Sequence, residues 1–140
     1  MSNKVPDVAF MQKALVAAPF HQWLGLSVIE TGADEIKLLM PWRDEVVSNP
    51  KSQSAHGGVL AALIDLTGFY ALIATGNMPL ATADLRVDYH QPATPGPLTI
   101  VGRVVRHGTT LSVAEANVLS EAGELLASGR GAYRMSRPSS

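Results

Sequence analysis

The 140-residue chain contains no cysteine and carries almost no net charge. The missing cysteines exclude disulfides, thiolate metal ligands and a cysteine nucleophile, and they are compatible with a reducing cytoplasm. Eleven Lys and Arg against twelve Asp and Glu give a formal charge of −1, so nothing indicates a nucleic-acid partner or an anionic membrane surface. We therefore expect a cytoplasmic protein with neither of these partners.

Several common signatures are also missing. The longest apolar run lies within 59–75, is interrupted by Asp65 and falls short of the ~20 residues that a membrane span needs. The sequence has no secretory signal, no Gly-rich phosphate loop, no Gly-x-Ser-x-Gly elbow and no His-Glu-x-x-His motif. His21, His90 and His107 show no metal-ligand spacing. We expect neither a metal nor a separate cofactor.

Composition predicts one globular domain over 1–140, with 1–6 and 136–140 flexible. Hydrophobic residues make up 46% and charged residues 16%, slightly more apolar surface than an ordinary domain buries. This excess indicates a subunit interface.

The order of elements predicts an α+β fold in which one antiparallel sheet packs on a long helix. Helical spacing after Asp7 predicts a helix through Ala18. The following turn carries Phe20 and Trp23, which we expect to plug the core. Strands are predicted over 26–29, 36–40, 81–89, 98–106, 110–120 and 124–135, and a polar loop over 43–55.

The long helix, 59–75, begins after His56-Gly57-Gly58 and has no polar face apart from Asp65. Such a helix is normally buried, and a carboxylate in apolar surroundings is costly unless it is paired or used. The unpaired N–H groups at the helix start suit a developing negative charge. Asp65 is therefore either a catalytic acid or a structural residue that caps a loop or pairs with a buried arginine.

The spacing of these groups has a consequence for assembly. Gly57 and Asp65 are eight residues apart, which is about 12 Å along a helix. A base or nucleophile and an oxyanion donor must both lie within roughly 3 Å of the reacting atoms. One chain cannot bring these two groups together, so the sequence predicts a two-fold dimer with two sites at its interface.

Five further segments accompany this motif: Phe20-His21-Gln22-Trp23-Leu24-Gly25, Asp84-Leu85-Arg86-Val87-Asp88-Tyr89, Pro92-Ala93, 102–108 and 127–131. Together they resemble the hotdog-fold acyl-CoA thioesterases, in the phenylacetic-acid-degradation-type (4-hydroxybenzoyl-CoA thioesterase-like) branch. The resemblance covers nearly the whole chain. It implies a curved antiparallel sheet wrapped around a long central helix, dimerising through the sheet, with a homodimer as the minimal unit and a homotetramer as the expected assembly.

The resemblance also implies roles for site residues. Asp65 would activate water as a general base or attack the thioester carbonyl itself. The N–H of Gly57 from the other subunit would polarise the thioester oxygen, and His56 would orient the substrate. Thr82 would position water near the acid, and Asn49 would hold the water or the acid.

Two points stay open at this level. Asn49 lies seven residues before His56, whereas the family usually has its Asn six before, so a residue of 52–54 could take its place. By strand alternation Thr82 and Tyr89 lie on opposite faces. Both can line one ligand only if the strand is bulged or the site spans a subunit boundary.

Coenzyme A, which enters as part of the substrate, needs groups that hold its phosphates. Arginine suits this task, and the expected substrate-binding residues are Gly58, Tyr89, Arg106, Arg130 and Arg134. Arg130 and Arg134 share one face of the last strand by the period of two. The alternative is a solvated strand face on which arginines balance nearby carboxylates, among them Glu115, and Tyr89 could equally belong to the core.

The expected function is hydrolysis of an acyl-CoA thioester to a free carboxylic acid and coenzyme A. One alternative is a non-catalytic acyl-CoA-binding protein on the same fold. The other is a hotdog dehydratase or hydratase, which pairs an acid with a histidine; nothing places a histidine beside Asp65 in the sequence.

Overall fold

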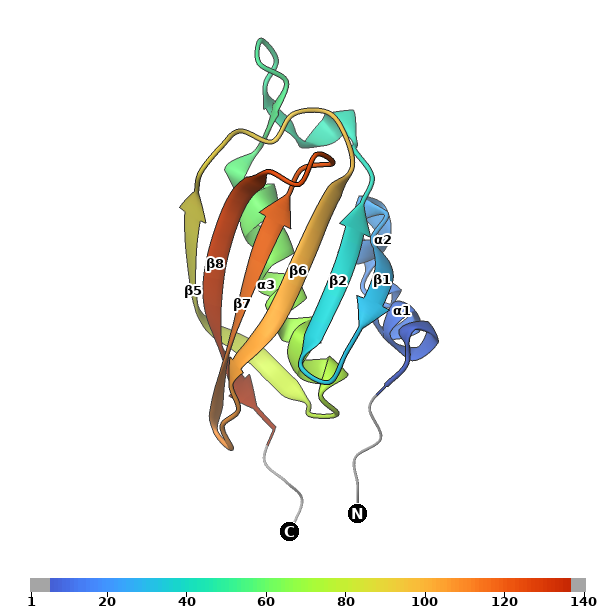
Figure 1. Cartoon of the computed structure of the whole chain (residues 1–140), viewed down its shortest axis with the longest axis vertical. Coiled ribbons are helices and arrows are strands. Elements are labelled where there is room, and N and C mark those ends of the chain that lie inside the picture. Colours follow the sequence, from blue (N-terminus) through green and yellow to red (C-terminus); the bar gives the residue numbers. More distant parts are fainter. Residues whose placement is uncertain (1–5, 137–140) are drawn as a thin grey trace.

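Six strands form one antiparallel sheet in the order β1-β2-β6-β7-β8-β5, and the helix α3 (Gly57–Ala74) packs across one face of it (Figure 1). The computed structural model describes residues 6–136. The strands of this sheet are β1 (Ser27–Thr31), β2 (Glu35–Met40), β5 (Pro79–Tyr89), β6 (Leu98–Arg106), β7 (Leu111–Leu119) and β8 (Leu125–Met135). This is the sheet-on-helix arrangement that the sequence predicts.

The predicted strands and the long helix are confirmed to within two residues at each end. The first helix, α1 (Val8–Val16), begins where expected, because the carboxylate of Asp7 accepts a hydrogen bond from the N–H of Phe10 at 2.9 Å. The central helix ends before Gly76, whose φ of 91° is the left-handed conformation that glycine adopts readily at a helix end.

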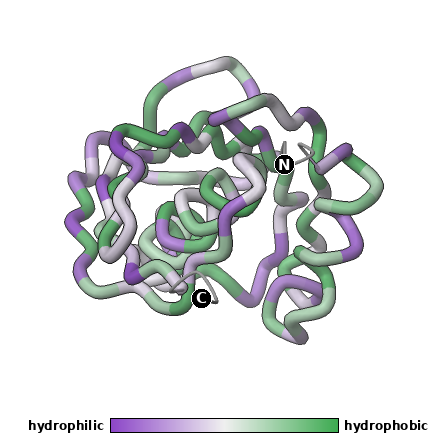
Figure 2. The backbone as a smooth tube through the Cα atoms, turned by 90° about the horizontal axis from the view of Figure 1, so that it is seen from below, coloured by the Kyte–Doolittle hydropathy of each residue, from purple (hydrophilic) through white to green (hydrophobic). Residues whose placement is uncertain are grey.

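The central helix is enclosed by the curled sheet, as the view from below shows (Figure 2). Ten of its eighteen residues are buried, and its contacts reach β2, β5, β6, β7 and β8. Within residues 6–136, α3 is the one helix long and apolar enough to cross a membrane. Its packing beneath the sheet accounts for that apolar composition.

The segment after α1 differs from the prediction. Residues 19–24 form a short helix, α2 (Pro19–Leu24), which Pro19 opens and Gly25 closes with a φ of 70°. The prediction that Phe20 and Trp23 plug the core is wrong, because their side chains are 47% and 41% exposed. The two rings stack on each other, and the guanidinium of Arg43 lies 4.2 Å from the Trp23 ring centroid. Leu24, fully buried, is the residue of this helix that enters the core.

The predicted loop over 43–55 contains short regular elements. A 3-10 turn, η1 (Asp44–Val46), leads into a small hairpin of β3 (Val47–Asn49) and β4 (Ser54–Ala55). The tight turn between them needs a positive φ at Gln53 (57°). These strands are too short to show alternation in the sequence.

The sequence predicts that residues 1–6 and 136–140, at the two chain ends, are flexible. Residues 1–5 and 137–140 lie outside the described range. Ser136 lies inside it, and its N–H donates to the carbonyl of Met78 at 3.0 Å.

Candidate active site beside the central helix

The first turn of α3 leaves one backbone donor free. His56 is the N-cap, and its Nδ1 accepts the N–H of Gly58 at 2.9 Å. The His56 carbonyl accepts the N–H of Val59 at 2.9 Å. Across residues 6–136, the N–H of Gly57 makes no hydrogen bond within the chain. It therefore remains available, at the positive end of the helix dipole, to an external acceptor.

Tyr89 covers this first turn. Its hydroxyl donates to the carbonyl of Gly57 at 2.7 Å, and its ring lies so close that a Cβ on Gly57 would meet ring atoms at 3.3 Å. A hollow beside the turn is lined by Ser54, Leu60, Pro92 and these two residues, among others. The missing side chain at position 57 thus leaves room for the close approach of Tyr89, and the hollow gives access to the start of the helix.

Asp65 lies two turns further along α3, on a partly exposed flank. Its carboxylate accepts a hydrogen bond from the hydroxyl of Thr82 on β5 at 2.7 Å. No arginine of the described chain pairs with it, which removes the buried-arginine alternative for this carboxylate. A carboxylate held by one hydroxyl donor keeps acceptor capacity for a water molecule.

A bulge in β5 brings Thr82 to this face. The pairing with β8 shifts between Thr82 and Asp84, so one extra residue enters β5 and the alternation of faces inverts there. Both Thr82 and Tyr89 consequently point toward α3. Strand alternation allows both residues to line one site if the strand is bulged or if the site spans a subunit boundary. The structure contains the bulge.

The structure keeps the two halves of the site apart within one chain. Thr82 and Tyr89 contact α3 at Asp65 and Gly57 respectively, and eight residues of helix, about 12 Å, separate these points. Gly57 and Asp65 of one chain cannot act on the same carbonyl.

Asn49 does not join Asp65 in the chain. Its side-chain carbonyl accepts the N–H of Lys51 at 3.0 Å, and its main-chain carbonyl accepts the N–H of Gln53 at 2.8 Å. Ser52 and Ser54 share a hydrogen bond of 2.9 Å in the same hairpin. Within one chain, these residues shape the turn that leads into His56.

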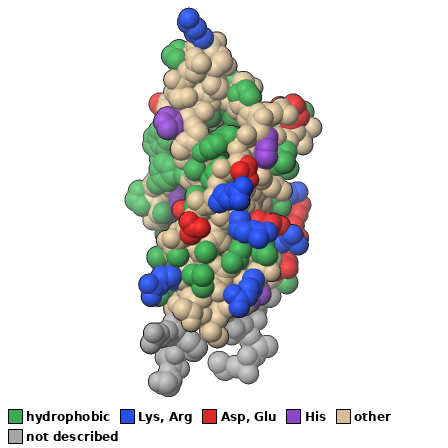
Figure 3. Space-filling view, turned by 90° about the vertical axis from the view of Figure 1, so that its left-hand side faces the viewer, with side chains coloured by type: hydrophobic (Ala, Val, Ile, Leu, Met, Phe, Trp, Pro, Cys, Tyr) green, Lys and Arg blue, Asp and Glu red, His purple; other side chains and the backbone are tan. Residues whose placement is uncertain are grey.

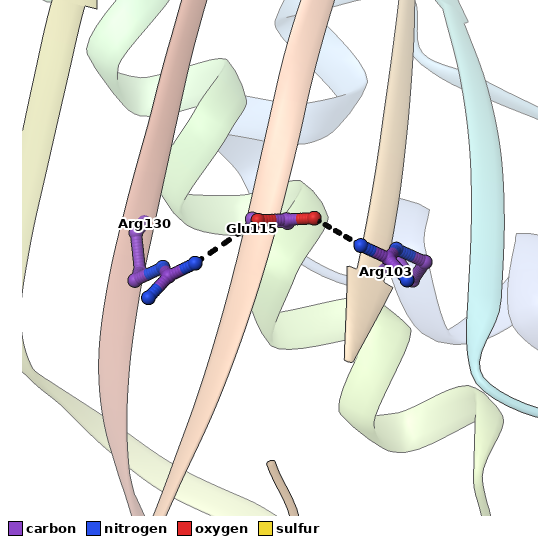
Figure 4. Close-up of polar contacts among 3 residues, drawn as sticks. All are labelled: Arg103, Glu115 and Arg130. Atoms are coloured by element: carbon purple, nitrogen blue, oxygen red, sulfur yellow. Dashed lines mark hydrogen bonds and ion pairs between the residues drawn. The ribbon is translucent and has the colours of Figure 1, made fainter. Parts of the chain in front are cut away.

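The expected phosphate-binding arginines lie on the sheet face that points away from α3. Glu115 on β7 bridges one of them, Arg130 on β8 at 3.4 Å, to Arg103 on β6 at 2.5 Å (Figure 4). Hydrogen bonding from Arg103 is the main reason that the pKa of Glu115 is lowered. Arg130 thus balances a carboxylate, as the alternative interpretation holds. Among the described residues no carboxylate lies within ion-pair distance of Arg106 or Arg134.

One residue that contacts Asp65 is not identified from the sequence pattern. Tyr133 on β8 is fully buried, and its hydroxyl donates to the main-chain carbonyl of Asp65 at 2.9 Å. Burial and the charge of Asp65 raise the pKa of Tyr133 far above its ordinary value. The available signal was its place on the helix-facing side of β8, two residues after Gly131, where a buried phenol needs a partner. Among residues 6–136 no three His, Asp or Glu side chains gather as a metal site requires.

Comparisons with known proteins agree with this architecture. The sequence model of the thioesterase superfamily matches residues 53–127, which contain His56, Gly57, Asp65, Thr82 and Tyr89. Acyl-coenzyme A thioesterase 13 of Mus musculus is 28% identical over 134 residues, covering 93% of this chain and 95% of the relative.

Two solved structures extend the comparison. A protein from the thioesterase superfamily superposes with a TM-score of 0.88 at 42% identity, covering 93% of this chain and 98% of the other. The Escherichia coli PaaI protein from the phenylacetic acid degradation operon has a TM-score of 0.76 at 21% identity, covering 92% and 96% of the two chains, and so shares the fold. From the family match, the sheet wrapped on α3 and these neighbours, the chain belongs to the thioesterase superfamily and has its hotdog fold.

Proposed function

We propose that the protein hydrolyses acyl-CoA thioesters to a free carboxylic acid and coenzyme A. The observation that carries this proposal is the pairing of the Asp65 carboxylate with the Thr82 hydroxyl on an accessible flank of α3. The uncommitted N–H of Gly57 supplies the second requirement, a donor for a developing oxyanion. The mouse relative, named as an acyl-coenzyme A thioesterase, supports the choice of thioester.

The chemistry assigns one task to each group. Asp65 takes a proton from water as the water oxygen adds to the thioester carbon, and the carbonyl oxygen becomes an oxyanion that accepts the Gly57 N–H. The C–S bond then breaks, and the departing thiolate of coenzyme A receives the proton. Direct attack by Asp65 breaks the same bond through a mixed anhydride, which water then hydrolyses. Thr82 holds the carboxylate in either route.

The proposed site needs a second copy of the chain. Because Asp65 and Gly57 lie about 12 Å apart along one helix, the oxyanion donor must come from the partner subunit. The outer edge of β5 is where a copy could add, since β5 ends the sheet order. Figure 3 shows the flank of the molecule on this side, where hydrophobic side chains lie between charged ones. Arg106 and Arg134 remain candidates for the coenzyme A phosphates within this proposal.

The test is a thiol-release screen over short, medium, long and aromatic acyl-CoAs. The protein contains no cysteine, so a thiol reagent detects only released coenzyme A. We expect turnover with at least one acyl class, and we expect Asp65→Asn to lower kcat about 100-fold or more, the range lost with a general base. Asp34→Asn, which removes an exposed carboxylate from the β1–β2 turn, is the matched control and should keep full activity.

Binding measurements separate an enzyme from a pure binder. Asp65→Asn should still bind a non-hydrolysable acyl-CoA thioether, because the carboxylate acts on water rather than on the coenzyme. If the unaltered protein binds this thioether but releases no thiol from any acyl-CoA, the hydrolase proposal fails and a binding protein remains.

A further inference from the structure

Two hydroxyl groups on neighbouring strands hold opposite ends of Asp65. Thr82 on β5 and Tyr133 on β8 are directly paired across the two strands. The Thr82 hydroxyl donates to the Asp65 carboxylate at 2.7 Å, and the Tyr133 hydroxyl donates to the Asp65 main-chain carbonyl at 2.9 Å. One cross-strand pair therefore fixes both the side chain and the backbone of the proposed catalytic acid.

The place that Tyr133 occupies is built around its hydroxyl. A Cβ added at Gly68 on α3, or at Gly131 on β8, would collide with the Tyr133 oxygen. Phe69, the neighbour of Gly68, meets the Tyr133 ring edge-on with centroids 6.0 Å apart. Two glycines thus leave the space in which the phenol reaches the helix backbone, and a ring packs against it there.

Burial makes the hydrogen bond of the Tyr133 hydroxyl costly to lose. A buried hydroxyl without a partner is costly, and the Asp65 carbonyl is the acceptor that Tyr133 has in the structure. Burial and the nearby Asp65 charge raise the pKa of Tyr133, so the phenol stays protonated and acts as a donor. The bond ties the turn of α3 that carries Asp65 to β8. This strand pairs with β5, on which Thr82 lies.

We infer that Tyr133 is a positioning residue for Asp65: it fixes that turn of α3 so that the carboxylate meets Thr82. The inference rests on the proposed function, in which Asp65 is the base or nucleophile. Tyr133 does not contact the substrate in this scheme. It acts through the main chain of Asp65, so its loss should lower kcat while leaving KM unchanged.

The chain provides a matched control in Tyr70. This tyrosine is also buried, its hydroxyl also donates to a main-chain carbonyl (Ala14, 3.2 Å), and burial also raises its pKa. Its bond ties α3 to α1 rather than to β8. Tyr133→Phe and Tyr70→Phe each remove one such hydroxyl and leave the ring in place, so both should lower Tm by a few degrees, about 2–4 °C for a chain of this size.

Activity should separate the two variants. With the acyl-CoA that the unaltered protein hydrolyses best, we expect kcat to fall about tenfold in Tyr133→Phe with KM within twofold, and both to be unchanged in Tyr70→Phe. Equal kcat values for the two variants would overturn the inference.

A stability measurement gives the inference a second way to fail, without activity. Thr82 and Tyr133 share Asp65 but form no hydrogen bond with each other. We expect the Tm losses of Thr82→Val and Tyr133→Phe to be non-additive, and those of Thr82→Val and Tyr70→Phe to be additive. Additive losses in the first pair would overturn the positioning role. Absence of turnover in the unaltered protein would overturn the proposed function instead, and the coupling would still test Tyr133.

Discussion

The imidazole of His56 accepts the N–H of Gly58 and thereby caps α3. A cap of this kind typically stabilises a protein by about 1 kcal/mol. Since the same side chain is exposed at the start of the helix, it could also contact the substrate. Loss of activity in a single His56 variant would mix these two roles.

Two substitutions separate the roles of His56. We expect His56→Ala to lose about 1 kcal/mol of unfolding free energy together with most of its turnover. Asparagine is a good N-cap residue, so His56→Asn should recover most of the stability while its turnover stays low, because the amide cannot reproduce the contacts of the imidazole. Urea unfolding and thiol release on the same preparations measure both quantities. Full turnover in His56→Asn would show that the histidine only caps the helix.

At the scale of elements, the long helix and the strands could be predicted because their patterns are strong. The apolar run after Gly58 indicated a buried helix, and alternation indicated each long strand. The hairpin over 47–55 could not be predicted, since β3 and β4 have three and two residues. Phe20 and Trp23 were misplaced because hydrophobicity alone does not distinguish a core position from a pair of rings stacked at the surface.

The site followed from the sequence only in part. Asp65 and Gly57 stood out because a carboxylate and a helix start are local features. The contact between Thr82 and Asp65 depends on a bulge in β5, and no residue type between 82 and 84 signals one. Tyr133 was missed because the residue that it bonds is Asp65, 68 positions away. Contacts of this kind depend on the packing of whole elements.

The ion pairs across β6, β7 and β8 give a pH-dependent contribution. Because Arg103 and Arg130 lower the pKa of Glu115, its stabilising effect is present above the unfolded-state pKa of about 4.3 and is lost as pH falls through the folded-state value. We expect Glu115→Gln to lose about 1 kcal/mol or less at pH 7, as partly exposed pairs do, and progressively less as the pH falls below about 4.

Urea unfolding at several pH values measures this contribution. Glu124→Gln is a matched control, because Glu124 is exposed in the β7–β8 turn and forms no ion pair among the described residues. A Glu115→Gln difference that is the same at pH 7 and pH 3 would contradict the role of its charge.

At the scale of the whole molecule, β5 presents an open edge. It is an eleven-residue strand at the end of the sheet, and Leu80 and Tyr89 on it are 63% and 54% exposed. An uncovered edge of this length readily pairs with another strand. A second copy placed there by a two-fold axis would extend the sheet and bring two copies of α3 side by side.

The two contacts on α3 predict the register of this pairing. To bring Asp65 to Gly57 of the partner subunit, Thr82 must lie opposite Tyr89 of the partner subunit. Residues that face α3 must also oppose one another. A two-fold axis through Arg86 satisfies both conditions. Leu85 then lies opposite Val87 of the partner subunit, so residues that face α3 oppose one another. The extra residue of the bulge places Thr82 opposite Tyr89 of the partner subunit.

Cross-linking tests this register in a chain with no cysteine of its own. Opposed Cα atoms in antiparallel strands are about 4.5–5.5 Å apart, within disulfide range. Since Arg86 would lie opposite its own copy in this register, we expect Arg86→Cys to form a disulfide-linked dimer under mild oxidation and to keep its turnover. Asp84→Cys and Asp88→Cys meet each other instead, so each alone should stay monomeric on a non-reducing gel while their mixture cross-links. Cross-linking through Leu85→Cys or Val87→Cys alone would place the axis one residue away and separate Asp65 from the partner's Gly57.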